Sequence, residues 1–261
     1  MNTDEVAKEV NLWAEKKTSG LIKEILPAGA VSNFTKLIFA NAIYFKGVWN
    51  EKFDTLDTKD YDFHLLDGSK VRTPFMTTKK KQLVSQYDGF KVLGLPYLQG
   101  EDKRHFTMYV FLPNENKDIS SLLHKFGSDS DFFDRHIPQE KVNVGLFLIP
   151  KFKISFGFEG TDILKELGLI LPFSNGEGLT EMVDSCVGQN LYVSSIYHKS
   201  FVEVNERGTE AAGASATAVA FGSRITNDKV DFVADHPFLF VLREDVSRAM
   251  LFMGQVVDPR C

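Results

Sequence analysis

The sequence lacks most of the features that would assign it to a special class of protein. Only two of its 261 residues are cysteines, Cys186 and Cys261, which is too few for the disulfide framework of a secreted scaffold. Its first residues have neither the basic start nor the apolar core of a signal peptide, and no apolar run reaches the roughly 18 residues of a membrane span. We therefore expect a cytoplasmic or nucleocytoplasmic protein that does not bind membranes.

A surplus of basic charge is also missing. Asp and Glu number 35 against 30 Lys and Arg, which gives a formal net charge of -5, whereas general nucleic-acid binders are basic. The only basic run, residues 79–81, is interpreted as a solvated turn, with a weak anion or cofactor patch as the alternative. Nucleic acid is not among the expected partners.

Enzymatic motifs are absent as well. The sequence contains no P-loop, no HExxH, no CxxC and no GxSxG elbow. The six histidines have no metal-ligand spacing, and the acidic residues are spread evenly rather than paired. Gly157 and Gly160 do not complete a dinucleotide fingerprint. We expect a protein that is not an enzyme and that has no cofactor and no metal site.

What the chain does contain is an ordinary globular composition, with 43% hydrophobic and 25% charged residues. Apolar and β-prone runs alternate with turns, including a probable hairpin turn at Asp67-Gly68. Helices are predicted for residues 4–26 and within 118–136, and a third begins with Thr161 or Asp162 as its N-cap. No repeat and no Pro- or Ser-rich linker divides the chain. The prediction is one α+β domain over residues 1–261.

Two of these segments carry more specific expectations. In the first helix, Val6, Val10 and Trp13 recur at helical spacing and predict a single apolar stripe. The run "LIFANAIYF", residues 37–45, is almost continuously apolar and predicts a central strand covered on both faces. Asn41 lies in the middle of this strand, and a buried amide there needs hydrogen-bond partners.

The stretch "ERGTEAAGASATAVAFGSRITND", residues 206–228, has no charged residue from 211 to 223, and nearly all its side chains are small. If this stretch formed a strand, alternate residues would point to opposite faces. One face, which begins at Thr209, would carry small uncharged side chains, and the other would carry Glu210 followed by alanines. We call the face that begins at Thr209 the first face. The members of this first face are Thr209, Ala211, Gly213, Ser215, Thr217 and Val219. Such a segment could slide between two existing strands, but a flexible Ala-rich linker is an equal alternative on composition alone.

Motifs along the whole chain resemble, in the expected order, those of the serpins, the serine protease inhibitors. They are "FANAIYFKGVWNEKF", "KVLGLPY", "MYVFLP", "IPKFKISF", "LTEMV", "HKSFVEVNERGTEAA", "DFVADHPFLF" and "LFMGQVVDP". Residues 35–47 and 94–100 look closest to the plant serpins. The resemblance implies a serpin fold, in which large mixed β-sheets and surrounding helices carry an exposed reactive-centre loop, here residues 206–228. It also leaves an extracellular location as an alternative.

The resemblance implies a suicide-substrate mechanism against a serine or cysteine endopeptidase. The protease cleaves the loop and forms an acyl-enzyme, and the loop then inserts as a new strand into the main sheet. Serpin loop insertion is itself the standard example of this kind of strand addition and of stored strain. The native state is then expected to be kinetically trapped.

Individual site residues follow from the same resemblance. The residues that resemble the hinge of the reactive-centre loop are Glu206, Gly208, Thr209, Glu210, Ala211, Ala212, Gly213 and Ala214. Gly208 and Thr209 stand at its pivot. Gly213 stands where these loops more often have alanine, which lowers β-propensity without forbidding insertion. Asn41 and His198 match the shutter, where the sheet opens, and Trp49 matches the breach, where the loop first enters.

The position of the scissile bond depends on the direction of counting. Counting forward from the hinge implies Gly222-Ser223, and counting back from "VDFVADHPF" implies Phe221-Gly222. Arg224 would suit a trypsin-like protease but lies beyond both positions. The target protease is therefore left open.

In serpins a substantial N-terminal portion precedes the helix that residues 4–26 resemble, and we expect this chain to lack those helices and strands. Inhibition is one hypothesis for such a chain. The alternative is a non-inhibitory interaction module or a simple protease substrate. A monomer is expected, with aggregation or strand pairing at an exposed edge as the alternative.

Overall fold

A computed structural model describes residues 2–101, 103–114, 119–174, 179, 182, 191–209 and 229–260. Its helices are α1 (Thr3–Lys17), α2 (Ile119–Ser128), α3 (Phe132–Arg135), α4 (Thr161–Glu166) and the 3-10 turn η1 (Leu171–Phe173). The strands up to the middle of the chain are β1 (Leu37–Tyr44), β2 (Gly47–Val48), β3 (Lys59–His64), β4 (Lys70–Met76), β5 (Gln82–Tyr87), β6 (Phe90–Pro96) and β7 (Phe106–Pro113). The later strands are β8 (Lys141–Val142), β9 (Val144–Pro150), β10 (Phe152–Glu159), β11 (Val193–Asn205), β12 (Gly208–Thr209), β13 (Val230–Val233), β14 (Phe238–Glu244) and β15 (Ala249–Val256).

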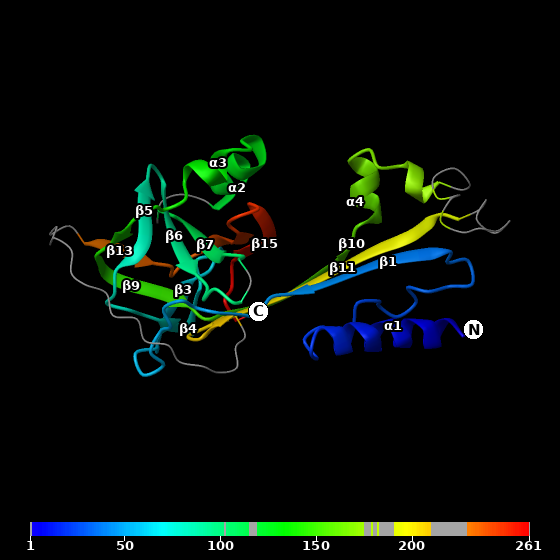
Figure 1. Cartoon of the computed structure of the whole chain (residues 1–261), viewed down its shortest axis with the longest axis horizontal. Helices are drawn as coiled ribbons and strands as arrows, with labels where there is room; N and C mark the ends of the chain where they lie inside the picture. Colours follow the sequence, from blue (N-terminus) through cyan, green and yellow to red (C-terminus); the bar gives the residue numbers. More distant parts are fainter. Residues whose placement is uncertain are drawn as a thin grey trace. The chain divides into compact units, whose positions relative to one another are not determined.

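The chain forms two compact units (Figure 1). The first unit comprises Met1–Phe45 and Ile154–Val202, and the second comprises Lys46–Lys153 and Glu203–Cys261. Strands β10 and β11 each run from one unit into the other. That residues 1–261 form a single domain stays a prediction.

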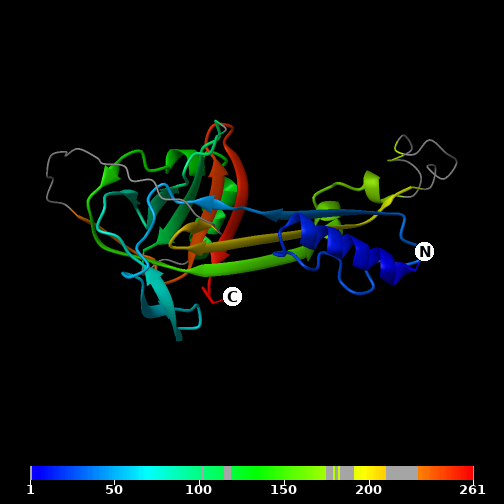
Figure 2. The same cartoon turned by 60° about the horizontal axis from the view of Figure 1, so that its bottom comes forward.

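In the first unit, β1 pairs in parallel with β11 along its whole length. Helix α1 runs beside these two strands in both views (Figure 2). Ala14 of α1 packs with Leu26 against side chains of β1 that alternate along the strand, among them Ile38 and Ala40. This packing covers one face of β1 and shows which of its residues face the helix.

Two predictions for α1 were wrong in detail. The helix ends at Lys17 rather than at Leu26, because Ser19 and Gly20 have positive φ angles of 55° and 83°, which end a right-handed helix. Trp13 is 49% exposed, and Ala14 takes the buried position beside it. Periodicity alone did not distinguish these neighbouring positions.

The prediction that residues 37–45 form a central, covered strand was also wrong. Among the described residues, β1 pairs only with β11. Phe39 is 43% exposed, and Asn41 is exposed. An apolar run shows that a strand could be buried on both faces, but it does not show whether other helices or strands pack against those faces.

The second unit contains two further sheets, a four-stranded sheet in the order β13-β9-β4-β3 and a six-stranded sheet in the order β15-β14-β7-β6-β5-β8. The predicted hairpin at Asp67-Gly68 is confirmed as the connection of β3 and β4, with Gly68 at a φ of 83°. Asp67 accepts hydrogen bonds from the backbone N–H and the hydroxyl of Ser69. The helix predicted near Thr161 is confirmed, but its N-cap is Gly160.

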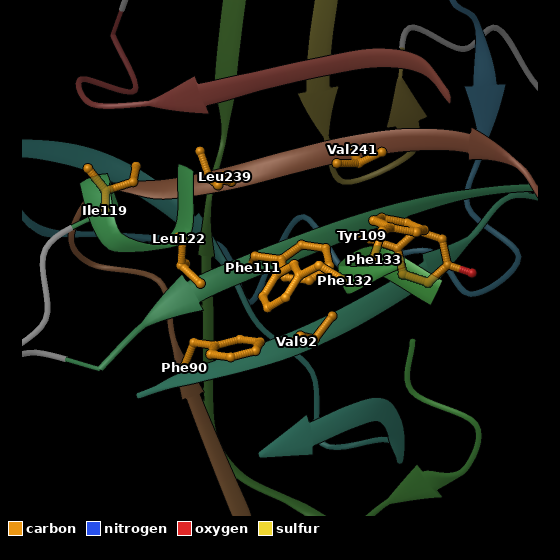
Figure 3. Packing of buried hydrophobic residues seen from close by; sticks show 10 residues of the cluster. All are labelled: Phe90, Val92, Tyr109, Phe111, Ile119, Leu122, Phe132, Phe133, Leu239 and Val241. Carbon is orange, nitrogen blue, oxygen red and sulfur yellow. The ribbon is translucent and has the colours of Figure 1, made fainter. Parts of the chain in front are cut away.

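Helices α2 and α3 pack an aromatic cluster on the six-stranded sheet, which confirms the helices predicted within residues 118–136 (Figure 3). Phe132 and Phe133 of α3 lie against Phe90 and Phe111 of β6 and β7. Burial of each such ring contributes roughly 1.5–3 kcal/mol. The cluster fixes β6, and β6 leads directly to Tyr97, which forms a β-bridge with Trp49. No helix in the described ranges is long and apolar enough to cross a membrane.

Candidate functional site

The end of β11 turns through Glu206 and Arg207 into the short strand β12. On one side of β12, Gly208 and Thr209 pair with Asn205 and Val204 of β11. On the other side they pair with residues 47–48 of β2. Thr209 is fully buried, with 0% exposure. The chain therefore enters residue 210 from a position that is hydrogen-bonded between two strands. We call residues 206–209 the hinge base.

Gly208 is the residue that this arrangement requires. Its φ of 146° lies in a region that side chains with a Cβ rarely adopt. A Cβ at this position would lie 2.0 Å from the carbonyl oxygen of Gly47 and 2.8 Å from the Cα of Val48. Because β12 approaches β2 so closely, no residue with a Cβ fits at position 208 without a shift of the backbone.

Trp49, which is predicted to lie at the breach, and Tyr97 pack against the hinge base. Their rings stack with centroids 4.4 Å apart, and the Trp49 Nε1–H donates a hydrogen bond to the carbonyl of Asn205 at 2.8 Å. The Tyr97 hydroxyl and the Thr209 hydroxyl are hydrogen-bonded at 2.6 Å. Burial raises the pKa of Tyr97, against a smaller lowering by its bond to Thr209, so the phenol stays neutral.

Glu206 is a buried carboxylate with its own set of partners. It is 7% exposed, it accepts a hydrogen bond from the Thr58 hydroxyl at 2.9 Å, and it pairs with the Lys151 ammonium at 3.0 Å. Burial by itself would raise the pKa of Glu206, but hydrogen bonds from its own backbone N–H, Lys151 and Thr58 outweigh this and lower the pKa. The carboxylate is therefore ionised at neutral pH and ties the turn to the break between β9 and β10, where Lys151 lies.

Backbone hydrogen bonds hold the same turn. The N–H of Trp49 donates to the carbonyl of Arg207 at 2.9 Å, and the N–H of Phe53 donates to the carbonyl of Glu206 at 3.0 Å. The N–H of Arg207 donates to the side chain of Asn205 at 3.0 Å. Backbone, carboxylate and hydroxyl contacts thus fix one end of the segment that follows Thr209.

The predicted shutter residues lie in the first unit. Asn41 of β1 and His198 of β11 are direct neighbours in the parallel pairing. His198 is half-buried, and its ring lies 5.6 Å from that of Phe158 on β10. The structure thus brings Asn41 and His198 together. The hinge residues Glu210, Ala211, Ala212, Gly213 and Ala214 and both predicted scissile bonds, at Phe221, Gly222 and Ser223, lie outside the described residues.

The sequence matches a known protein family over nearly the whole chain. A family profile described as "Serpin (serine protease inhibitor)" matches residues 1–259. The chain belongs to the serpin family. Serpin-ZX of Arabidopsis thaliana is 61% identical over 257 residues, which are 98% of this chain and 66% of that relative. Serpin-ZXA of Oryza sativa subsp. japonica is 58% identical over 98% of this chain and 64% of its own length. The chain thus spans about two thirds of the length of these serpins.

Solved serpin structures agree with the fold. The structure of Arabidopsis AtSerpin1 in its native stressed conformation has 58% sequence identity and a TM-score of 0.86, over 98% of this chain and 65% of that chain. The serpin fold and the similarity to plant serpins that the motifs predicted are confirmed. The family description also confirms a protease-inhibitor family rather than an enzyme family.

Sequence reasoning did not find several residues of the site. Lys151, Thr58 and Tyr97 all contact the hinge base from segments far away in the sequence. Tyr97 and Lys151 do lie inside two of the serpin-like motifs, "KVLGLPY" and "IPKFKISF", which is the only signal that marked them. Within the described ranges, no group of three or more His, Cys, Asp or Glu could hold a metal ion. The hinge, shutter and breach assignments stay predictions.

Proposed function

We propose that this serpin presents residues 210–228 as bait to an endopeptidase and inserts the cleaved loop between β1 and β11. The position of β12 between β11 and β2 carries the proposal. Because β12 runs antiparallel to β11, residues that follow Thr209 in the sheet would also run antiparallel to β11. On its other side β12 pairs with β2, which directly follows β1 in the chain. The inserted residues would therefore lie between β11 and β1. The parallel pairs between β1 and β11, beginning with Tyr44 and Phe201, are those that insertion would break.

The burial of Thr209 supports a definite parity for the inserted strand. Since its side chain is fully buried, alternate residues after it would face the same way on insertion. These are Ala211, Gly213, Ser215, Thr217 and Val219, all small or uncharged. Ala212 would face the opposite way. A charge at 211 would therefore be buried on insertion, and a charge at 212 would not.

The target is proposed to be a serine endopeptidase, with a cysteine endopeptidase as the alternative. Cleavage is proposed at Gly222-Ser223 or, one residue earlier, at Phe221-Gly222. Incubation of the whole chain with trypsin-like, chymotrypsin-like and papain-like proteases tests this, and N-terminal sequencing of the fragment identifies the bond. An adduct that resists SDS supports inhibition.

Ala211→Glu and Ala212→Glu form a matched pair for the mechanism. With Ala211→Glu we expect loss of the adduct and turnover of the chain as a substrate, and with Ala212→Glu we expect the adduct to persist. Equal adduct formation by the two variants would contradict insertion with this parity.

A non-inhibitory interaction module is the second candidate. The exposed Phe39 and Asn41 on β1, a strand paired only with β11 among the described residues, favour it because unpaired edges bind other chains. Its expected outcome is clean cleavage near Gly222 with no adduct and no rise in thermal stability.

A further inference from the structure

A groove lined by both charged and apolar residues lies beside the hinge base in the second unit. Its volume is about 510 Å³, within the range of roughly 300–1,000 Å³ that small-molecule sites occupy. Its walls come from β4, from the break between β9 and β10, and from residues 203–207 at the end of β11 and in the following turn. We call this cavity the hinge groove. It offers a ligand direct contact with the residues that fix β12.

The charged side chains that the structure describes in the hinge groove include one cation without a carboxylate partner. Lys151 is paired with Glu206, and Lys153 faces Glu203 at 3.7 Å. Arg207 also lines the groove and is exposed, and no described carboxylate lies within ion-pair distance of its guanidinium. Among the described lining residues there is thus one positive charge in excess. It belongs to Arg207, whose planar guanidinium suits a carboxylate.

The remaining lining is partly apolar. Pro74, Phe152, Val204 and Pro259 contribute to the walls, and the Thr55 and Thr73 side chains add hydroxyl groups. A fully polar anion such as phosphate would leave the apolar walls unused. A ligand with a carboxylate at one end and an apolar body would use both parts of the groove.

We propose that the hinge groove binds a small amphipathic monocarboxylate through Arg207. A ligand held there touches five consecutive residues, 203–207, whose conformation sets the pairing of β12. By linkage, it therefore stabilises the turn in its present form.

Binding is tested on the intact chain by isothermal titration calorimetry with N-acetylphenylalanine and with its uncharged C-terminal amide. Saturable binding of the acid is expected, with affinity for the amide lower by at least about tenfold because the charge-assisted bond is lost. Equal affinity for acid and amide, or no saturable binding of the acid, would overturn the proposal.

Arg207→Gln and Arg72→Gln locate the site with the same change of net charge. Arg72 lies on β4 next to the groove-lining Thr73 and donates to the carbonyl of Asp60 on β3. Arg207→Gln should weaken binding of the acid by about tenfold or more, and Arg72→Gln should leave it unchanged. If both variants weakened binding of the acid equally, the acid would be held by general attraction of its charge, and the assignment of the site to the hinge groove would be wrong.

Discussion

The hinge end of β11 and the middle of the same strand are enclosed to very different degrees. At residues 206–209, buried side chains meet a carboxylate partner, a hydroxyl partner and two flanking strands. At His198 the strand pairs with Asn41 of β1, which is exposed, and the His198 ring lies 5.6 Å from that of Phe158 on the neighbouring strand β10. Phe39 of β1 is 43% exposed. The hinge base is thus held by many specific contacts, whereas the shutter pair shows few among the described residues. Sensitivity to substitution should fall steeply from Gly208 to Asn41.

The largest loss is expected from Gly208→Ala. The new Cβ meets the carbonyl oxygen of Gly47, and the φ of 146° adds strain, so the free energy of unfolding should fall by about 2–4 kcal/mol. Gly68→Ala is the control, because its φ is also positive at 83° but no atom lies within 4 Å of the added Cβ. It should lose only about 1 kcal/mol. Thermal unfolding at a fixed scan rate measures both, and equal losses would mean that crowding at Gly208 is unimportant.

Glu206→Gln is expected to have the next largest effect. It leaves the partly exposed Lys151 without its carboxylate and should lower the free energy of unfolding by roughly 1–3 kcal/mol. Glu203→Gln, next to the more exposed Lys153, should cost less than about 1 kcal/mol. Denaturant midpoints of the two variants decide this, and a larger loss from Glu203→Gln would reverse the ranking of the two pairs.

The same variant predicts a dependence on pH. The pKa of Glu206 in the folded protein lies below its ordinary value of 4.5. Its contribution is therefore fully present above about pH 4.5 and is lost as the pH falls through the lower folded pKa. Parent and Glu206→Gln should differ in thermal midpoint at pH 7 and converge in acid. A constant difference down to the lowest pH at which the protein stays folded would argue against a stabilising charge at Glu206.

The sequence marked the residues of the hinge base but not their partners. The family motif contains both Gly208 and Thr209, and the alternation of small residues begins at Thr209. Lys151 and Thr58 could not be identified as partners of Glu206, because pairing across 55 and 148 residues of sequence depends on the packing of several strands. The wrong prediction for Asn41 has the opposite cause, since an apolar run records what a strand could bury and not what covers it. Trp13 shows the same limit on a helix.

Tyr97→Phe should have a smaller effect than Glu206→Gln. It removes the hydrogen bond with Thr209 and keeps the ring stacked on Trp49, so a loss of about 1 kcal/mol is expected. Tyr61→Phe, at an exposed tyrosine on β3, should change stability by less than about 0.5 kcal/mol. Addition of Thr209→Val to Tyr97→Phe should cost little more, because both remove the same bond. Fully additive losses would show that the two hydroxyls do not depend on each other.

The smallest effect is expected from Asn41→Ala at the shutter. Asn41 is exposed, so the free energy of unfolding should change by less than about 0.5 kcal/mol. Asn11→Ala in the same unit is the control, because the Asn11 side chain accepts from the N–H groups of Ile25 and Leu26 and donates to the carbonyl of Leu26. It should lose roughly 1–3 kcal/mol, since three backbone groups lose their partner. If Asn41→Ala were as damaging as Asn11→Ala, the amide of Asn41 would be held in the folded protein. The shutter pair would then be held as firmly as the hinge base, and the contrast between the hinge end and the middle of β11 would disappear.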